Sequence, residues 1–225
     1  MSISQISAEF FPQLARQNIS RRLVKLKRHG FLDWHVICPT AGNRLSVYSV
    51  TPRALEIVRE RYRFRIVKSF CKSDSVEHDI QLVEVRKRLH ALQSVAGYYT
   101  ENMLQACEEF SSKDSMAAFV KNNTDAVLEV RKNGKITTVG LEFERSEKGL
   151  DRYAKKILSY YSDPRTAVIL YVCRNAAIQK TLARAEASVM GEGPPRCFYA
   201  LLENVLQANG KCIFTNRKGA TITLE

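Results

Sequence analysis

The sequence predicts a two-domain α+β chain. A small basic domain of helices and one β-hairpin is expected over residues 1–72, and an α/β domain with a mixed sheet over residues 76–225. Four observations favour this fold class. The 225 residues suffice for two small domains. The positive charge is concentrated in the first third, and hydrophobic runs of helical and strand type alternate in the rest. A polar joint, Ser-Asp-Ser at 73–75, separates the two parts.

The net charge of +12 is unevenly distributed. Residues 1–72 hold 14 Lys and Arg against 4 Asp and Glu, a balance of +10, whereas residues 73–225 hold 21 against 19, a balance of +2. A basic segment this local attracts a polyanion through counterion release, and nucleic acid is the commonest such partner. The alternative is a solvated basic surface that serves solubility.

Several classes of protein are disfavoured by what the sequence lacks. No apolar run is long enough to span a membrane, and the first residues lack the pattern of a secretory signal. The six cysteines are scattered without a Cys-x-x-Cys pair, as expected for reduced thiols in a cytoplasmic protein. No phosphate-binding P-loop and no dinucleotide-binding glycine signature is present, which disfavours ATPases and nicotinamide enzymes.

The first domain is predicted to contain a basic amphipathic helix that stops at Gly30. Ile19, Leu23 and Leu26 recur at helical spacing and predict one apolar stripe. Polar and basic residues occupy the rest of the surface: Gln17, Asn18, Arg21, Arg22, Lys25 and Arg28.

A hairpin and a further helix are predicted after this helix. Two β-rich runs, Leu32–Cys38 and Leu45–Val50, flank turn-forming residues at 39–44. Thr51 is the expected N-cap of a basic helix over Pro52–Val67, with proline at its first position. This helix is a candidate dimerisation element.

The order of basic helix, glycine, hairpin and helix resembles a winged helix-turn-helix over roughly residues 7–67. The resemblance implies that the helix enters the major groove of double-stranded DNA and that the hairpin tip contacts the DNA as a wing. The implied DNA-contacting residues are Gln17, Asn18, Arg21, Arg22, Lys25 and Arg28, with Arg44 on the wing. The sequence departs from the family because only a few residues precede Ile6, where a further helix is usual. Some winged helices bind proteins instead, which is the alternative here.

The remaining residues predict an α/β sandwich with a mixed sheet. Helical periodicity is found at 76–93, 150–161 and 176–189, and β-rich runs at 97–104, 124–131, 135–145, 166–173 and 197–206. The expected order is therefore helix, three strands, helix, strand, helix, strand.

The central hairpin can be registered from the sequence. Asn133-Gly134 predicts a two-residue type I′ turn, which places Lys132 opposite Lys135. Asp125 then faces Glu142. The alternation of side chains places Asp125, Glu129, Glu142 and Glu144 on one face and apolar residues on the other. A slip of one residue would bring the acids into the apolar face.

Two carboxylates opposite each other on a sheet repel, so a cation or water is needed near Asp125 and Glu142. Mg²⁺ takes oxygen ligands from one or two carboxylates together with a phosphate. Such an ion activates water in phosphodiester hydrolysis. The facing acids are therefore a candidate metal site.

The pattern of a helix, a hairpin with Asp and then Glu on adjoining strands, a helix and a strand resembles the restriction-endonuclease-like PD-(D/E)xK core. Together with the N-terminal unit, the "HDI" at 78–80 and the "LEFER" at 141–145, it is similar to the replication-relaxation family of plasmids, phages and integrative elements. In nuclease members the two acids bind the metal, and a lysine two residues after the second acid assists water. Asp125 and Glu142 match those acids.

Glu144 stands where the lysine of the resembling nucleases is expected, a reversal of charge. Lys155 or Lys156 from the next helix could replace that lysine, and Lys156 is favoured because it lies close to the predicted buried stripe. Glu84 on the first helix of this domain is a candidate accessory acid, as is Glu144. The alternative is that Glu142 and Glu144 are surface carboxylates balanced by Arg145, Lys155 and Lys156.

The resemblance and the charge together imply a cytoplasmic, double-stranded-DNA-binding regulator of transcription or replication of a mobile genetic element. As a regulator it needs no cofactor, has no membrane partner, and is expected to pair into a homodimer or touch flanking DNA through a nuclease-like domain without activity. The alternative is a Mg²⁺- or Mn²⁺-dependent DNA endonuclease with Asp125, Glu142 and Lys156 as its catalytic residues and Asp125 and Glu142 as its metal ligands.

Overall fold

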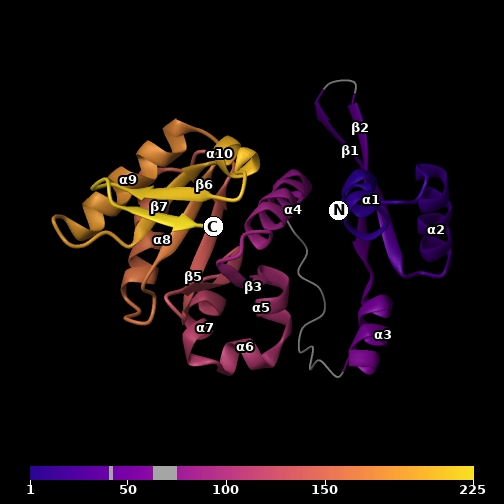
Figure 1. The fold of residues 1–225 in the computed structure, drawn as a ribbon, viewed down its shortest axis with the longest axis horizontal. Helices are drawn as coiled ribbons and strands as arrows, with labels where there is room; N and C mark the ends of the chain where they lie inside the picture. Colours follow the sequence, from indigo (N-terminus) through magenta and orange to yellow (C-terminus); the bar gives the residue numbers. More distant parts are fainter. Residues whose placement is uncertain (41–42, 63–74) are drawn as a thin grey trace. The chain divides into compact units, whose positions relative to one another are not determined.

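A computed structural model of the protein describes residues 1–40, 43–62 and 75–225. The chain divides into two compact units, Met1–Val83 and Glu84–Glu225 (Figure 1). The joint predicted at 73–75 lies outside the described residues except for Ser75. The helix α4 (Val76–His90) runs across the boundary between the units.

Over its described residues up to Tyr62, the first unit contains three helices and a two-stranded antiparallel hairpin: α1 (Ile3–Phe10), α2 (Arg16–Arg28), β1 (Leu32–Thr40), β2 (Asn43–Val50) and α3 (Pro52–Tyr62). Ser2 and Gln5 form a capping box that starts α1. A small core of Ile3 and Ile6 from α1 and Ile19 and Leu23 from α2 joins the two helices. Ser2 also bridges to Val47, which pairs with His35 on its other side, so the start of the chain lies along the outer edge of β2.

Most local predictions for this unit are confirmed. Gly30 follows α2 with φ +71°, a conformation that favours glycine. Thr51 caps α3, because its hydroxyl accepts from the backbone N–H of Ala54 at 3.2 Å. The prediction for Leu26 is wrong: this side chain is 40% exposed, since only the first two turns of α2 pack against α1. The predicted continuation of α3 over 63–67 and the turn residues 41–42 lie outside the described residues.

The second unit is built on a seven-stranded mixed sheet in the order β3-β4-β5-β6-β7-β8-β9. The strands β5, β6 and β7 are parallel to one another, and the other neighbours are antiparallel. The strands are β3 (Val95–Thr100), β4 (Ala126–Lys132), β5 (Lys135–Glu144), β6 (Ile169–Cys173), β7 (Cys197–Leu201), β8 (Cys212–Asn216) and β9 (Thr221–Leu224). The helices after α4 are α5 (Glu101–Ala106), α6 (Glu108–Ser112), α7 (Asp114–Lys121), α8 (Leu150–Tyr161), α9 (Ala176–Met190) and α10 (Leu202–Gln207).

Both faces of this sheet are buried. On one face α8 and α9 pack side by side (Figure 1). Their apolar residues share a core with α5, α6 and α7. The other face carries buried apolar residues from five strands: Leu128, Leu141, Phe143, Leu170, Val172, Phe198, Ala200 and Phe214. The predicted sandwich with a mixed sheet is therefore confirmed in its coarse form.

The sheet is curled, so that its two edges meet at one end. Ser94, which precedes β3, donates its backbone N–H to the carbonyl oxygen of Glu225, which follows β9. The N–H of Glu225 in turn donates to the Ser94 hydroxyl at 2.9 Å. The order of elements predicted from the sequence did not include α5, α6, α7, α10, β8 and β9. The strand predicted at 97–104 is wrong in its second half, which belongs to α5.

The predicted register of the central hairpin is confirmed. Lys132 pairs with Lys135 and Ala126 with Leu141, and Asn133 and Gly134 have φ of 50° and 73° as a type I′ turn requires. Asp125 lies one residue before β4, and continuation of the register places it opposite Glu142. The acids thus lie on the predicted face of the sheet, which α8 covers.

Candidate functional site

The outer surface of α2 is the first candidate site. Six of its 13 residues are Lys or Arg and none is acidic. The predicted contact residues Gln17, Asn18, Arg21, Arg22, Lys25 and Arg28 are all exposed, and so is Arg44 at the start of β2. Because Ile19 and Leu23 hold the opposite side of the helix in the core, this basic surface has a fixed orientation within its unit.

Two cations of α2 are held over aromatic rings at its flanks. The guanidinium carbon of Arg22 lies 5.4 Å from the ring centroid of Phe11, and the ammonium nitrogen of Lys27 lies 4.5 Å from that of Trp34 on β1. Contacts of this kind contribute about 0.5–1 kcal/mol at exposed sites. They reduce the freedom of two long side chains that sequence periodicity alone treats as solvated.

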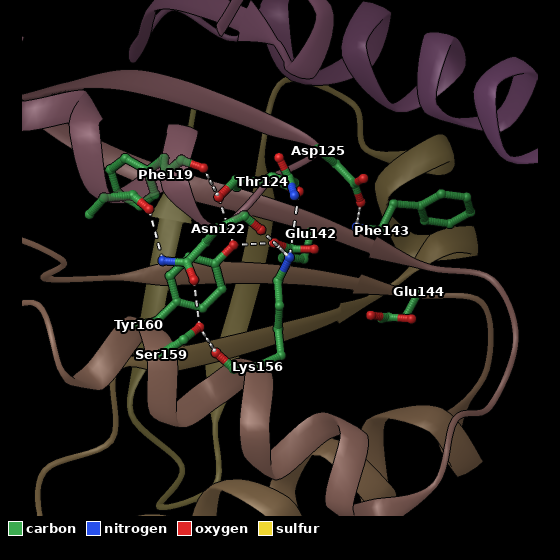
Figure 2. Close-up of polar contacts among 12 residues, drawn as sticks. Phe119, Asn122, Thr124, Asp125, Glu142, Phe143, Glu144, Lys156, Ser159 and Tyr160 are labelled. Carbon is green, nitrogen blue, oxygen red and sulfur yellow. Dashed lines mark hydrogen bonds and ion pairs between the residues drawn. The ribbon is translucent and has the colours of Figure 1, made fainter. Parts of the chain in front are cut away.

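The second candidate site is a pocket of about 340 Å³ beside α8. Its walls contain two acids and four basic residues: Glu142, Glu144, Lys148, Arg152, Lys155 and Lys156, together with Tyr153 and Ser159. Figure 2 shows Lys156 reaching from α8 toward Glu142 on β5. The ammonium of Lys156 is 3.0 Å from the Glu142 carboxylate, so the lysine favoured from the sequence does meet this acid.

Glu142 is only 5% exposed and lies among several hydrogen-bonding groups. The Tyr160 hydroxyl donates to the same Glu142 oxygen that Lys156 approaches, and it lies 2.6 Å from the Thr124 hydroxyl. Lys156 also donates to the backbone oxygen of Asn122 at 2.7 Å. The buried acid is therefore held by partners from α8.

Asp125 has a structural task beside its position opposite Glu142. Its Oδ2 accepts the backbone N–H of Phe143 at 2.7 Å (Figure 2). Because β4 begins only at Ala126 while β5 continues past this point, the carboxylate takes the place of a strand partner for Phe143.

Glu144 is also buried, at 4% exposure, and pairs with Lys148 at 2.7 Å. The alternative interpretation of Glu142 and Glu144 as surface carboxylates is therefore wrong, because α8 and the loop before it cover both. Lys155 is exposed at the pocket rim, and the predicted accessory acid Glu84 lies on α4 and does not line the pocket.

Burial raises the pKa of the Glu142 carboxyl from 4.5 to about 7, against the opposing attraction of Lys156. The charge of Asp125 raises this pKa further. Burial likewise raises the pKa of Glu144, and the Lys148 ammonium partly offsets that increase.

The free energy of unfolding is expected to depend on pH through the titration of Glu142. Because the pKa is higher in the folded state, the native protein binds more protons between pH 4.5 and about 7, and the Glu142 contribution to stability falls as pH rises through this window. In Glu142→Gln this decrease is absent. The unfolding free energy of the variant relative to wild type should therefore increase by up to about 3 kcal/mol from pH 5 to pH 8, measured by urea denaturation.

Glu203→Gln is the matched control, because Glu203 is exposed on α10. This variant should follow wild type across the same range. A difference between Glu142→Gln and wild type that is independent of pH would contradict the burial-driven pKa.

Several partners of the two buried acids were not found from the sequence. Lys148 lies in the loop before α8, where helical spacing gives no guide, and Tyr160 and Thr124 join Glu142 from segments far apart in the chain. A signal for Tyr160 exists in hindsight: it continues the buried stripe of Tyr153 and Ile157 along α8.

Comparison of the chain with family models, curated proteins and solved structures gave no match. Among the described residues, no three His, Cys, Asp or Glu side chains gather in a way that could hold a metal ion. Over residues 1–40, 43–62 and 75–225, no helix has the length and apolarity needed to cross a bilayer. Any function assigned to the chain therefore rests on the residues and contacts described above.

Proposed function

We propose that the protein binds double-stranded DNA through α2 and regulates transcription or replication of a mobile genetic element. The observation that carries the proposal is the exposed face of α2, where six basic residues and no acid follow one another on a helix anchored by Ile19 and Leu23. An α-helix fits the major groove of B-DNA, and positive charge draws it to the phosphates.

The arrangement around α2 supports a winged helix-turn-helix interpretation of this unit. The helix follows a shorter helix, α1, through a brief turn, and the β1-β2 hairpin comes directly after it as a wing. Gln17 and Asn18 in the first turn of α2 have side-chain amides that suit adenine edges, and arginines suit guanine edges. In this proposal the second unit is a nuclease-like domain without activity.

The proposal predicts salt-dependent binding of duplex DNA by the intact chain. Fluorescence anisotropy with a labelled short duplex should show an affinity that falls steeply and linearly on a plot of log affinity against log salt concentration. The loss of affinity reflects release of counterions from phosphates that Lys and Arg neutralise. Absence of binding at low salt would contradict the proposal.

A second candidate function is a Mg²⁺- or Mn²⁺-dependent DNA endonuclease. The observation that favours it is the pairing of Glu142 with Lys156 at one pocket, together with the position of Asp125 opposite Glu142 in the register of the sheet. Oxygen ligands from Asp125 and Glu142 would suit a hard divalent cation, which supplies activation of water at a phosphodiester. Glu144 and the more distant Glu84 would be accessory acids.

Three contacts weigh against activity and make the regulator the preferred function. Lys156 pairs with Glu142 at 3.0 Å, so a metal ion would have to displace an ammonium group from this carboxyl group. One oxygen of Asp125 holds the backbone of Phe143. Glu144 is paired with Lys148 and adds negative charge where the resembling nucleases have a lysine.

Cleavage by wild type and Glu142→Gln distinguishes the two functions. Supercoiled and branched DNA is incubated with each protein and Mg²⁺ or Mn²⁺. The regulator predicts no nicking by either protein and equal DNA binding by both. Metal-dependent nicking by wild type that disappears in Glu142→Gln would establish the endonuclease instead.

A further inference from the structure

We infer that Phe11 and Trp34 position Arg22 and Lys27 as a pair of clamps for the phosphates on either side of the groove that α2 occupies. The inference rests on the proposed function, and it assigns roles to three residues that sequence periodicity did not single out: Phe11, Lys27 and Trp34. Arg22, which the resemblance implies as a DNA-contacting residue, is assigned here to a phosphate.

The positions of Arg22 and Lys27 around α2 support their assignment to phosphates. Arg22 and Lys27 are five residues apart, or about 140° around a helix of 3.6 residues per turn. Ile19 and Leu23 lie between them on that arc and are buried. Each cation therefore borders the buried stripe on a different side. Gln17, Arg21 and Arg28 lie opposite the stripe, where a helix in a groove meets base edges.

The aromatic contacts come from different elements of the unit. Phe11 follows α1 and is half-buried beside the small core, whereas Trp34 lies on β1 and is 42% exposed. Arg22 and Lys27 are exposed, so both charges remain accessible to a ligand. A ring beneath each cation limits its rotamers before DNA arrives, which reduces the ordering that binding requires.

The ligand chemistry is a phosphodiester and not a base. A lysine held at a flank is a point charge with no bidentate geometry for a base edge, and phosphates line both sides of the groove. Loss of either clamp should therefore weaken binding by a similar factor for every duplex sequence. Loss of the ring alone should weaken binding without removing a charge.

The test compares salt dependence among single variants with a short mixed-sequence duplex. Arg22→Ala and Lys27→Ala should each flatten the slope of log affinity against log salt concentration by about 0.9, the value for one phosphate contact. Phe11→Leu and Trp34→Leu should keep the wild-type slope and lose about two- to fivefold in affinity. Lys135→Ala removes an exposed charge from the β4-β5 hairpin and should change neither quantity.

Trp34 is the only tryptophan of the chain, so its emission gives a second readout. Addition of duplex should change Trp34 emission in wild type and in Arg22→Ala, and much less in Lys27→Ala. Trp34→Leu should fold as wild type does, because the side chain is 42% exposed. Thermal melting checks the folding of both Trp34→Leu and Phe11→Leu.

The outcomes separate this inference from the proposed function. If wild type binds duplex DNA but Arg22→Ala and Lys27→Ala retain its affinity and slope, the clamp is wrong and the proposed function stands. If wild type does not bind duplex DNA at all, both fail.

Discussion

Replacement of Arg21 and Arg22 together by alanine is expected to lower the affinity for a specific duplex by at least about 30-fold. Each arginine that contacts a base or phosphate contributes roughly 1–3 kcal/mol, and every factor of ten corresponds to about 1.4 kcal/mol. Arg21 is exposed on the side of α2 away from Ile19 and Leu23. Arg22 is exposed beside the buried stripe, over the ring of Phe11. The loss should appear in a mobility-shift assay as disappearance of the specific complex.

The matched control removes two charges elsewhere. Lys132 and Lys135 face each other across the turn of the β4-β5 hairpin and are both exposed. The variant Lys132→Ala/Lys135→Ala therefore has the same net charge as the α2 variant. Equal loss in both variants would indicate a general charge effect, and unchanged affinity and salt slope in Arg21→Ala/Arg22→Ala would exclude α2 as the DNA-binding surface.

Glu186→Ala should destabilise the second unit by about 3–5 kcal/mol, the cost of breaking a buried network around a charge. Glu186 on α9 is 0% exposed and is surrounded by donors. Its carboxylate accepts from the Tyr161 hydroxyl at 2.5 Å, the Tyr199 hydroxyl at 2.9 Å and the backbone N–H of Cys197 at 2.9 Å. Alanine would leave these buried donors without a partner.

Chemical denaturation of the intact chain measures this effect. Glu186→Gln keeps the size of the side chain and one acceptor oxygen, so it should lose less stability than the alanine variant. Glu203→Ala on α10 removes an exposed carboxylate and should change stability by less than about 0.5 kcal/mol. A loss in Glu186→Ala no larger than that of Glu203→Ala would contradict the structural role of the network.

The sequence was most informative where a local rule determines a conformation. Asn133-Gly134 predicted the hairpin register because both residues adopt positive φ, and the register then predicted that Asp125 faces Glu142. The stop of α2 before Gly30 and the cap at Thr51 follow from equally local chemistry. Lys156 was favoured on the spacing of α8, and its ammonium does contact Glu142.

Features that depend on distant parts of the chain were not predictable. The helices α5, α6 and α7 are five to eight residues long, too short to show a clear period. The alternation of side chains along β4 and β5 predicted an acidic face. It could not predict that α8 buries this face, because alternation says nothing about which element packs on a sheet. The network of Glu186 joins α9 with Tyr161 and Tyr199, which no spacing connects.

Selection of bound sequences from a pool of random duplex DNA tests the central claim most directly, namely that α2 reads double-stranded DNA. Wild type, Lys27→Ala and the double variant Gln17→Ala/Asn18→Ala are taken through the same selection. We predict that wild type enriches a defined motif, that Lys27→Ala enriches the same motif with lower affinity, and that Gln17→Ala/Asn18→Ala loses or alters it. No enrichment by wild type would contradict sequence reading by α2, and so would enrichment of the same motif to the same degree by Gln17→Ala/Asn18→Ala.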